Sequence, residues 1–237
     1  MNRNELIVLK NPKSPISEIF RTLRTNIQFM NTNQNAKTIL ITSAFANEGK
    51  SWISSNLSIA FAQTGKKVLL IDADMRKGRQ SSIFNISPLP GLSNYLSNSC
   101  NNTELNLEEE IIKYLRKTDV ENLYVMPSGN IPPNPSELLN LPQMKDLLEK
   151  VKRMCDIIII DGTPCQLVAD SLIISGIVEN TIIVTASEET KKDGLKRIVT
   201  NIENIGGKIS GIVLNKVPIV SKDYQETYYY SSHKTKK

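Results

Sequence analysis

The sequence predicts an open α/β fold, in which a mostly parallel sheet carries helices on both of its faces. Three observations predict it. Six short apolar runs, most of them near-continuous Ile, Val and Leu, have the pattern of strands buried on both faces. Helical patterns lie between these runs, as right-handed crossovers require. A Gly-Lys-Ser tripeptide at residues 49–51 follows the first run, in the strand–loop–helix order of a phosphate-binding loop.

The elements follow one another along the chain in that order. We expect strands at 38–42, 67–71, 123–126, 157–160, 181–185 and 209–214. A helix is predicted from Ser51 to about Gln63, and another at 191–205, where apolar residues recur at helical spacing until Gly206. Residues 78–110 are rich in Ser, Asn and Pro and predict a long excursion. Three segments result: an N-terminal helical segment (1–37), a nucleotide-binding domain (38–217) and a polar, mobile tail (218–237).

Composition limits the function classes. The chain has 237 residues, 40% of them hydrophobic and 22% charged, which suits one large globular domain or at most two. A net charge of +5 fits an anionic ligand and is too small to indicate nucleic acid. No run approaches the roughly 20 apolar residues that span a bilayer. Three scattered cysteines, Cys100, Cys155 and Cys165, indicate reduced thiols in the cytoplasm. The single histidine, His233, lies in the tail, so acid–base chemistry falls to carboxylates or lysines.

The phosphate loop predicts a site for ATP and Mg²⁺. Backbone N–H groups of the loop and of the following helix point at phosphate oxygens. In this pattern Lys50 places its charge on the β and γ phosphates, and Ser51 gives a hydroxyl to the metal. Ala44 stands where the usual motif has its first glycine. The alternative is an ordinary helix capped by Ser51, with Lys50 in solvent. The expected nucleotide contacts are Ala46, Asn47, Glu48, Gly49, Lys50, Ser51 and Trp52.

Three aspartates follow buried strands. Asp72 and Asp74 end the second predicted strand, and Asp161 ends the fourth. Ligands of open α/β sheets bind at the edge where these strand ends lie. Each aspartate alone could be a turn or helix cap, but together with Lys50 they make the carboxylate set that Mg-ATP chemistry needs. Asp156 precedes its strand and is expected at the opposite edge.

These motifs resemble those of the P-loop tyrosine kinases that act in bacterial capsule and exopolysaccharide synthesis, which are related to the MinD/ParA-type ATPases. The resemblance covers almost the whole chain. SAFANEGKS matches the family's Walker A, LLIDADMRK its Walker A′ and IIIIDGTP its Walker B. VMPSGNIPPNPSELL at 125–139 resembles a Pro-rich stretch typical of the family. GIVLNK places Asn215 where relatives hold adenine. The chain departs from the family pattern at Ala46, Asn47, Gly78, Gly162 and Thr163, and none of these departures removes a charged group.

The resemblance implies roles for these residues. It implies phosphoryl transfer from ATP to tyrosine, with Lys50 on the phosphates and Ser51, Asp74 and Asp161 around Mg²⁺. Asp72 is the candidate for orienting the phenol and receiving its proton. A cluster of tail tyrosines is the expected substrate segment, although a sticky strand or docking patch is the plainer interpretation. The expected phosphorylation sites are Tyr224, Tyr228, Tyr229 and Tyr230.

Partners are also implied by the resemblance. Glu18, Arg21 and Arg24 match the family's subunit-contact motif and predict a homo-oligomer such as a ring. On physical grounds alone, the same residues equally suit a surface helix with internal ion pairs. The apolar stripe of this helix is predicted to be Ile19, Leu23 and Ile27. The family works with a membrane-bound polysaccharide co-polymerase that acts as activator. A cytoplasmic chain recruited to the inner face of the membrane is therefore expected, with no nucleic-acid partner.

Two alternative functions remain open. A MinD- or ParA-like ATPase switch would share the fold and the carboxylates, but such proteins carry an extra lysine early in the loop, where this chain has Phe45. The chain also lacks a C-terminal amphipathic helix for membrane binding. A non-catalytic nucleotide-binding regulator is the third hypothesis. The complete set of Lys50, Ser51 and three aspartates argues against it.

Overall fold

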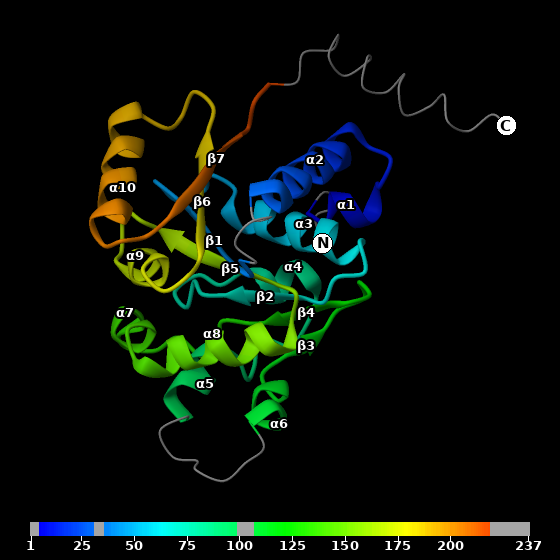
Figure 1. Ribbon diagram of the computed structural model, residues 1–237, viewed down its shortest axis with the longest axis vertical. Helices are drawn as coiled ribbons and strands as arrows, with labels where there is room; N and C mark the ends of the chain where they lie inside the picture. The colour runs from blue at the N-terminus through cyan, green and yellow to red at the C-terminus, as the bar shows by residue number, and fades with distance from the viewer. Residues whose placement is uncertain (1–4, 31–35, 99–106, 219–237) are drawn as a thin grey trace, which may run out of the picture.

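A seven-stranded sheet forms the centre of the molecule in a computed structural model that describes residues 5–30, 36–98 and 107–218 (Figure 1). The strand order is β3-β4-β2-β5-β1-β6-β7. All neighbouring pairs are parallel except β3 with β4. The strands are β1 (Thr38–Ser43), β2 (Val68–Asp72), β3 (Arg116–Lys117), β4 (Leu123–Met126), β5 (Ile157–Pro164), β6 (Asn180–Ala186) and β7 (Ile209–Asn215). The six predicted strands and the mostly parallel sheet are confirmed, whereas β3, only two residues long, was not predicted.

One face of the sheet is covered by the N-terminal helices and the helix of the phosphate loop. These are α1 (Ile7–Lys10), α2 (Pro15–Met30), α3 (Lys50–Ala62) and α4 (Gln80–Phe84). Alternate strand residues such as Ile39, Ile41 and Leu70 point to this face and pack against Leu57 and Phe61 of α3. Because side chains alternate along a strand, a run that is apolar at every position can serve two cores.

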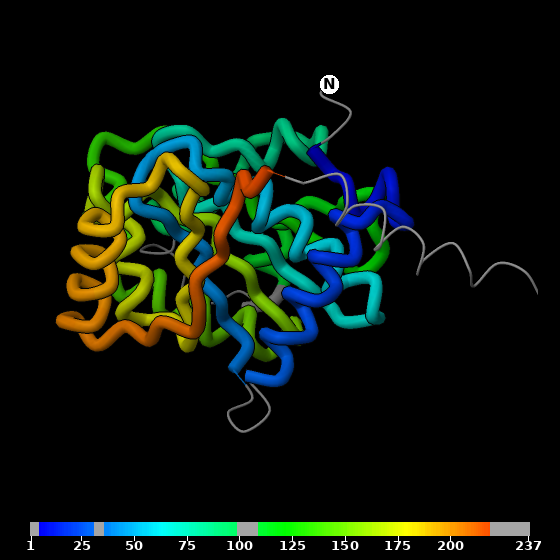
Figure 2. The backbone as a smooth tube through the Cα atoms, turned by 90° about the horizontal axis from the view of Figure 1, so that it is seen from above, coloured from blue at the N-terminus to red at the C-terminus, as the bar shows by residue number. Residues whose placement is uncertain are grey.

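The other face carries the remaining helices. These are α5 (Leu92–Asn98), α6 (Leu107–Ile112), α7 (Pro135–Leu139), α8 (Pro142–Met154), α9 (Asp170–Ser175) and α10 (Lys192–Asn204). Leu40, Leu69 and Ile158, the intervening strand residues, pack in this second core. Figure 2 shows α10 (orange) apart from α1 and α2 (blue), with β7 between them. The expected excursion over 78–110 is partly wrong, because α4, α5 and the start of α6 occupy its described parts.

Helix α2 packs on α3 through one apolar side. Phe20 and Ile27 are buried, and the Phe20 ring meets the Trp52 ring edge-on at 5.1 Å between centroids. Leu23 packs against the same core, but Ile19 is 60% exposed, so the predicted stripe was wrong at that residue. The buried residues recur at spacings of three and four, the separation that places side chains on one side of a helix.

The three charged residues of α2 have partners within the chain. Glu18 pairs with Arg21, whose Nη2 also donates to the Pro12 carbonyl at 2.7 Å. Arg24 Nη1 donates to the Ala60 carbonyl near the end of α3, at 3.1 Å. These contacts within one chain agree with the interpretation of α2 as a surface helix. The subunit contact through the same residues stays a prediction. Within the described part of the chain, no helix combines the length and the apolarity needed to cross a bilayer.

Candidate active site

The phosphate loop joins β1 to α3 through backbone that only some residues adopt easily. Gly49 caps α3 with φ +98° and Asn47 has φ +65°, both in the left-handed region. A Cβ at Gly49 would lie 2.1 Å from Asn215 Nδ2, so glycine is required there for space as well as for conformation. Ala44, which replaces the usual first glycine, is fully buried beside Cys165 and Ile183, and its methyl group therefore contributes to the core.

A cleft of about 400 Å³ opens beside this loop. Lys50, Ser51 and Asp74 line it, as do four of the expected nucleotide contacts, Ala46, Asn47, Gly49 and Trp52. The remaining lining residues come from the end of β5 and from the segments that follow β2 and β5: Arg76, Lys77, Arg79, Thr163, Pro164, Leu167 and Val168. Together with Lys50, the side chains of Arg76, Lys77 and Arg79 make four cationic groups around the cleft, which therefore suits a ligand that carries several negative charges.

Two predicted carboxylates lie beneath the cleft rather than in its wall. Asp72 and Asp161 are register partners across β2 and β5, and each is 1% exposed. Asp72 Oδ1 accepts a 3.3 Å hydrogen bond from the Asp74 backbone N–H. Asp161 Oδ1 lies 3.3 Å from Ser54 Oγ on α3, whose one proton is shared with the Lys50 carbonyl. The structure therefore brings the three aspartates together at the carboxyl edge, as predicted, with only Asp74 on the cleft surface.

Burial dominates the electrostatics of these groups. It raises the pKa of Asp72 well above its usual range, and repulsion from Asp161 raises that pKa further. Burial also raises the pKa of Asp161, although hydrogen bonds from Gln80 and Ser51 and the charge of Lys50 oppose the rise. The pKa of Lys50 is lowered by burial against the attraction of Asp161 and Asp74. Such a cluster favours binding of a cation near the carboxylates and of anionic phosphates near the lysine.

Gln80, at the start of α4, is a site residue that sequence reasoning missed. Its side chain is fully buried, and its Nε2 donates to Asp161 Oδ2 at 2.7 Å and to the Ser51 carbonyl at 3.2 Å. Its backbone N–H donates to Asp72 Oδ2 at 2.9 Å. Nothing in the sequence distinguishes this polar residue of a short helix from a surface position. Its role follows only from the turn that folds α4 back onto the strand ends.

Arg76 forms a second unpredicted network at the rim of the cleft. Its Nε and Nη2 donate to the two carboxylate oxygens of Asp170, at 3.0 and 3.3 Å, and Asp170 is fully buried. Ser136, from the Pro-rich stretch, donates to the same carboxylate. A paired guanidinium of this kind has a fixed direction. The Pro-rich stretch is thereby connected to the segment that follows β2.

Glu48 and Asn215 lie behind the loop and do not line the cleft. Glu48 is buried, its Oε2 accepts from the Phe45 backbone N–H at 2.7 Å, and its other oxygen pairs with Thr190. Asn215 Nδ2 donates to the Glu48 carbonyl at 2.9 Å. Both residues therefore hold the shape of the loop. The expected contact of Asn215 with adenine stays a prediction.

Two departures from the family pattern have a steric reason. A Cβ at Gly78 would lie 2.3 Å from Ser128 Oγ and 2.9 Å from Asp72 Oδ2. A Cβ at Gly162 would lie 2.3 Å from Ser171 Oγ. At both positions a neighbouring serine fills the space, so the departures preserve close packing around the carboxylates.

The donor set fits Mg²⁺ held partly by phosphates. Within residues 5–30, 36–98 and 107–218, no group of three or more His, Cys, Asp or Glu side chains is arranged to hold a metal. Magnesium commonly takes one or two carboxylates together with phosphate oxygens and water. Ser51 and Asp74 at the cleft, with Asp161 close by, supply such a partial set. The four tail tyrosines lie outside the described residues.

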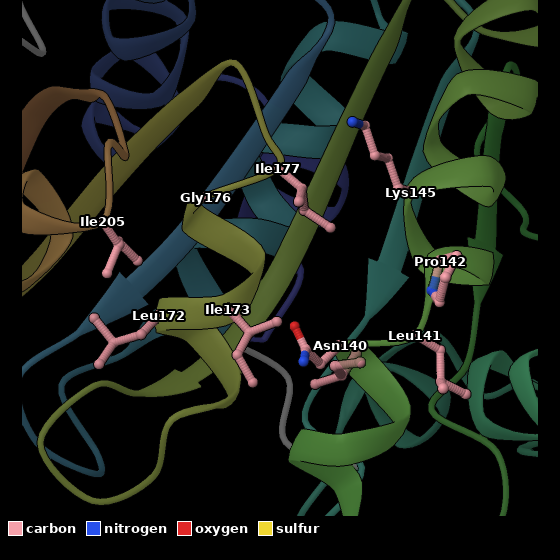
Figure 3. A pocket seen from close by; sticks show the side chains of 10 residues that line it. Asn140, Leu141, Pro142, Lys145, Leu172, Ile173, Gly176, Ile177 and Ile205 are labelled. Atoms are coloured by element: carbon pink, nitrogen blue, oxygen red, sulfur yellow. The ribbon is translucent and has the colours of Figure 1, made fainter.

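A second pocket, of about 490 Å³, lies between helices of the opposite face of the sheet and is apolar (Figure 3). Leu172, Ile173 and Ile177 form one wall, and the α7–α8 corner forms the other with Leu141 and Lys145. Ile205, after α10, closes one end. No sequence pattern predicted this pocket, because its walls come from three separate segments.

Comparison with known proteins identifies the family. The AAA domain family matches residues 36–213. The chain is 38% identical to the putative tyrosine-protein kinase CapB of Staphylococcus aureus over 95% of this chain and 93% of CapB. It is 35% identical to the tyrosine-protein kinase YwqD of Bacillus subtilis (strain 168), over 97% and 92% of the two chains.

Solved structures agree with this assignment. The chimerical protein CapA2B2 superposes with a TM-score of 0.82 at 39% identity, covering 91% of each chain. The MinD protein of Pyrococcus horikoshii, complexed with Mg-ADP, shares the fold with a TM-score of 0.61 at 22% identity, covering 81% and 76% of the chains. With its phosphate loop, carboxylate edge and near-complete coverage of these kinases, the chain belongs to the bacterial tyrosine-protein kinase family of CapB and YwqD.

Proposed function

We propose that this chain transfers the γ-phosphoryl group of ATP to tyrosine hydroxyls, including those of its own C-terminal cluster, and thereby regulates capsule or exopolysaccharide synthesis. The observation that carries the proposal is the cleft lined by Lys50, Ser51 and Asp74, next to the buried Asp72–Asp161 pair that Gln80 links by hydrogen bonds. The kinase names of the relatives support tyrosine as the acceptor.

The chain's residues divide the work of an in-line transfer. When bound, ATP supplies the γ-phosphoryl group and Mg²⁺ offsets the charge of the phosphates. Lys50 and the loop N–H groups hold the phosphates, and Ser51, Asp74 and Asp161 are the residues that would hold the metal. A tyrosine phenol has a pKa near 10 and needs a base at neutral pH. We propose Asp72 as that base. Its raised pKa suits a group that accepts a proton, but its burial keeps it from the phenol until the site rearranges around the substrate.

The proposal includes partners. A chimera named CapA2B2 among the solved relatives supports a separate activator protein, and a relative from a cps region of Klebsiella pneumoniae supports a role in polysaccharide synthesis. We propose a membrane-bound co-polymerase as that activator, recruitment of this chain to the inner membrane face, and a homo-oligomer formed through Glu18, Arg21 and Arg24 of α2.

Phosphate mapping tests the function. The purified chain is incubated with Mg-ATP, with and without the cytoplasmic segment of the proposed co-polymerase, and modified residues are located by mass spectrometry. Phosphate on one or more of Tyr224, Tyr228, Tyr229 and Tyr230 supports the kinase. Steady ATP hydrolysis without phosphotyrosine in either sample favours the MinD-like ATPase switch instead.

A further inference from the structure

The two buried aspartates of the site are both hydrogen-bonded to one residue, Gln80. Asp72 and Asp161 are neighbours across β2 and β5, and each is only 1% exposed. Two carboxylates so placed repel each other when ionised and need donors from the protein, because they have little access to water. Gln80 contacts both aspartates, through its backbone N–H to Asp72 and its side-chain amide to Asp161.

The orientation of the Gln80 amide is fixed by its surroundings. The two groups that its nitrogen meets, the Asp161 carboxylate and the Ser51 carbonyl, are both acceptors, so only the NH₂ end can face them. Its Oε1 lies 2.8 Å from Ser55 Oγ on α3, whose one proton is shared between this oxygen and the Ser51 carbonyl at 2.6 Å. The amide therefore connects Asp161 of β5 to the start of the phosphate-loop helix α3.

We propose that Gln80 is a positioning residue, which holds Asp161 at a set place relative to Ser51 and so couples the metal-facing carboxylate to the phosphate loop. This inference rests on the proposed function for its effect on phosphoryl transfer. The geometry favours this role over simple core packing, because every polar atom of the Gln80 side chain bonds to the loop helix or to a site carboxylate. Ser51 and Asp161, the residues that would hold Mg²⁺, need a constant separation to do so.

The test replaces the amide and keeps its volume. Gln80→Met retains the backbone N–H that bonds to Asp72 and removes only the side-chain bonds. Nucleotide affinity is measured by fluorescence titration with mant-ADP, with and without Mg²⁺. We expect the affinity without Mg²⁺ to change less than about threefold, and the Mg²⁺-dependent gain in affinity to fall about tenfold. In the phosphorylation assay kcat falls about 10–100-fold, while KM for ATP at saturating Mg²⁺ changes little.

A matched variant separates positioning from folding. Ser55→Ala removes the hydroxyl that bonds Gln80 Oε1 and leaves the amide in place, so it is expected to show a smaller loss in the same direction, about two- to fivefold. A wild-type Mg²⁺-dependent gain in Gln80→Met overturns the proposal. If Gln80→Met does not fold, Ser55→Ala decides alone, and a wild-type gain in it overturns the proposal. The binding arm stands even if the chain transfers no phosphate, so failure of the proposed function is recognised separately.

Discussion

Carboxylates occupy both edges of the central sheet, and the chain surrounds them differently. At the amino edge, Glu179 Oε2 accepts hydrogen bonds from the Lys37 and Thr38 backbone N–H groups, at 2.6 and 2.8 Å, and Lys152 lies 3.2 Å from its other oxygen. Burial opposes its ionisation, but these donors outweigh burial and lower its pKa. At the carboxyl edge, Asp72 and Asp161 have donors too, yet their pKa values are raised, first by burial.

The difference separates structure from function. Glu179 joins the start of β1 to the turn before β6 and has cationic and N–H partners throughout. Ionising both Asp72 and Asp161 in their buried place costs stability, and a bound cation would offset that cost. A carboxylate with a lowered pKa, such as Glu179, stabilises the unliganded protein. Carboxylates with raised pKa values, such as Asp72 and Asp161, are typical of a ligand-binding site. Three substitutions test this comparison, in order of expected effect.

The largest effect is expected for Lys50→Ala at the carboxyl edge. The change removes the cationic side chain that lies among the aspartates and faces the cleft. Phosphoryl transfer is expected to fall by at least about 10²-fold, since the lost charge acts on the transferring phosphate. Tyrosine phosphorylation followed by mass spectrometry measures it. Transfer at the wild-type rate would remove Lys50 from the phosphate site.

Asp161→Asn is expected to weaken activity and strengthen the fold. The amide keeps an acceptor for Gln80 and removes a buried charge, so the unliganded protein gains about 1 kcal/mol, or roughly 2–4 °C in Tm. Because the folded-state pKa of Asp161 is raised, the aspartate favours folding at acid pH and loses that advantage as pH rises through its pKa. The gain in Tm of the variant should therefore grow from pH 4 to pH 7. A Tm below that of the wild type at pH 7 would contradict the view that the buried charge of Asp161 destabilises the unliganded protein.

Glu179→Gln should do the reverse at the amino edge. The variant loses charge-assisted hydrogen bonds from Lys37 and Thr38, at a cost of about 1 kcal/mol after allowance for a half-exposed, screened group. The pKa of Glu179 is lowered, so its contribution is present at neutral pH and is lost as pH falls through that pKa. Thermal melts should show a larger loss at pH 7 than at pH 4, where the contribution of Glu179 is already reduced. Phosphoryl transfer should be unchanged, and a large loss of it would end the distinction between the edges.

Much of this arrangement is predictable from the sequence. Near-continuous apolar runs identified six strands because buried parallel strands need both faces apolar. Asp72, Asp74 and Asp161 could be placed at one edge since each follows a strand, and Asp156, which precedes one, bonds to the Lys67 backbone N–H at the opposite edge as expected. The direction of each strand is enough to predict at which edge of the sheet the residue lies.

Other features depend on tertiary contacts that no local pattern encodes. Gln80 and the Arg76–Asp170 pair join segments far apart in the sequence, so neither residue type nor spacing reveals them. The exposure of Ile19 arose because Phe20, the next residue along α2, takes the buried position beside Trp52. The depth of Asp72 beneath the cleft likewise follows from the turn at Gly78 that folds α4 over it.

Transfer between subunits tests the central claim most directly. A Lys50→Met chain that keeps its tyrosines is mixed with an active chain in which Tyr224, Tyr228, Tyr229 and Tyr230 are all Phe, in the presence of Mg-ATP and the activator segment. In-line attack needs a phenol that approaches from the γ-phosphate side, which a neighbour's tail can supply. We predict phosphate on the tail of the Lys50→Met chain, at a rate that rises with protein concentration. ATP hydrolysis without phosphotyrosine on either chain would contradict the kinase and leave an ATPase switch.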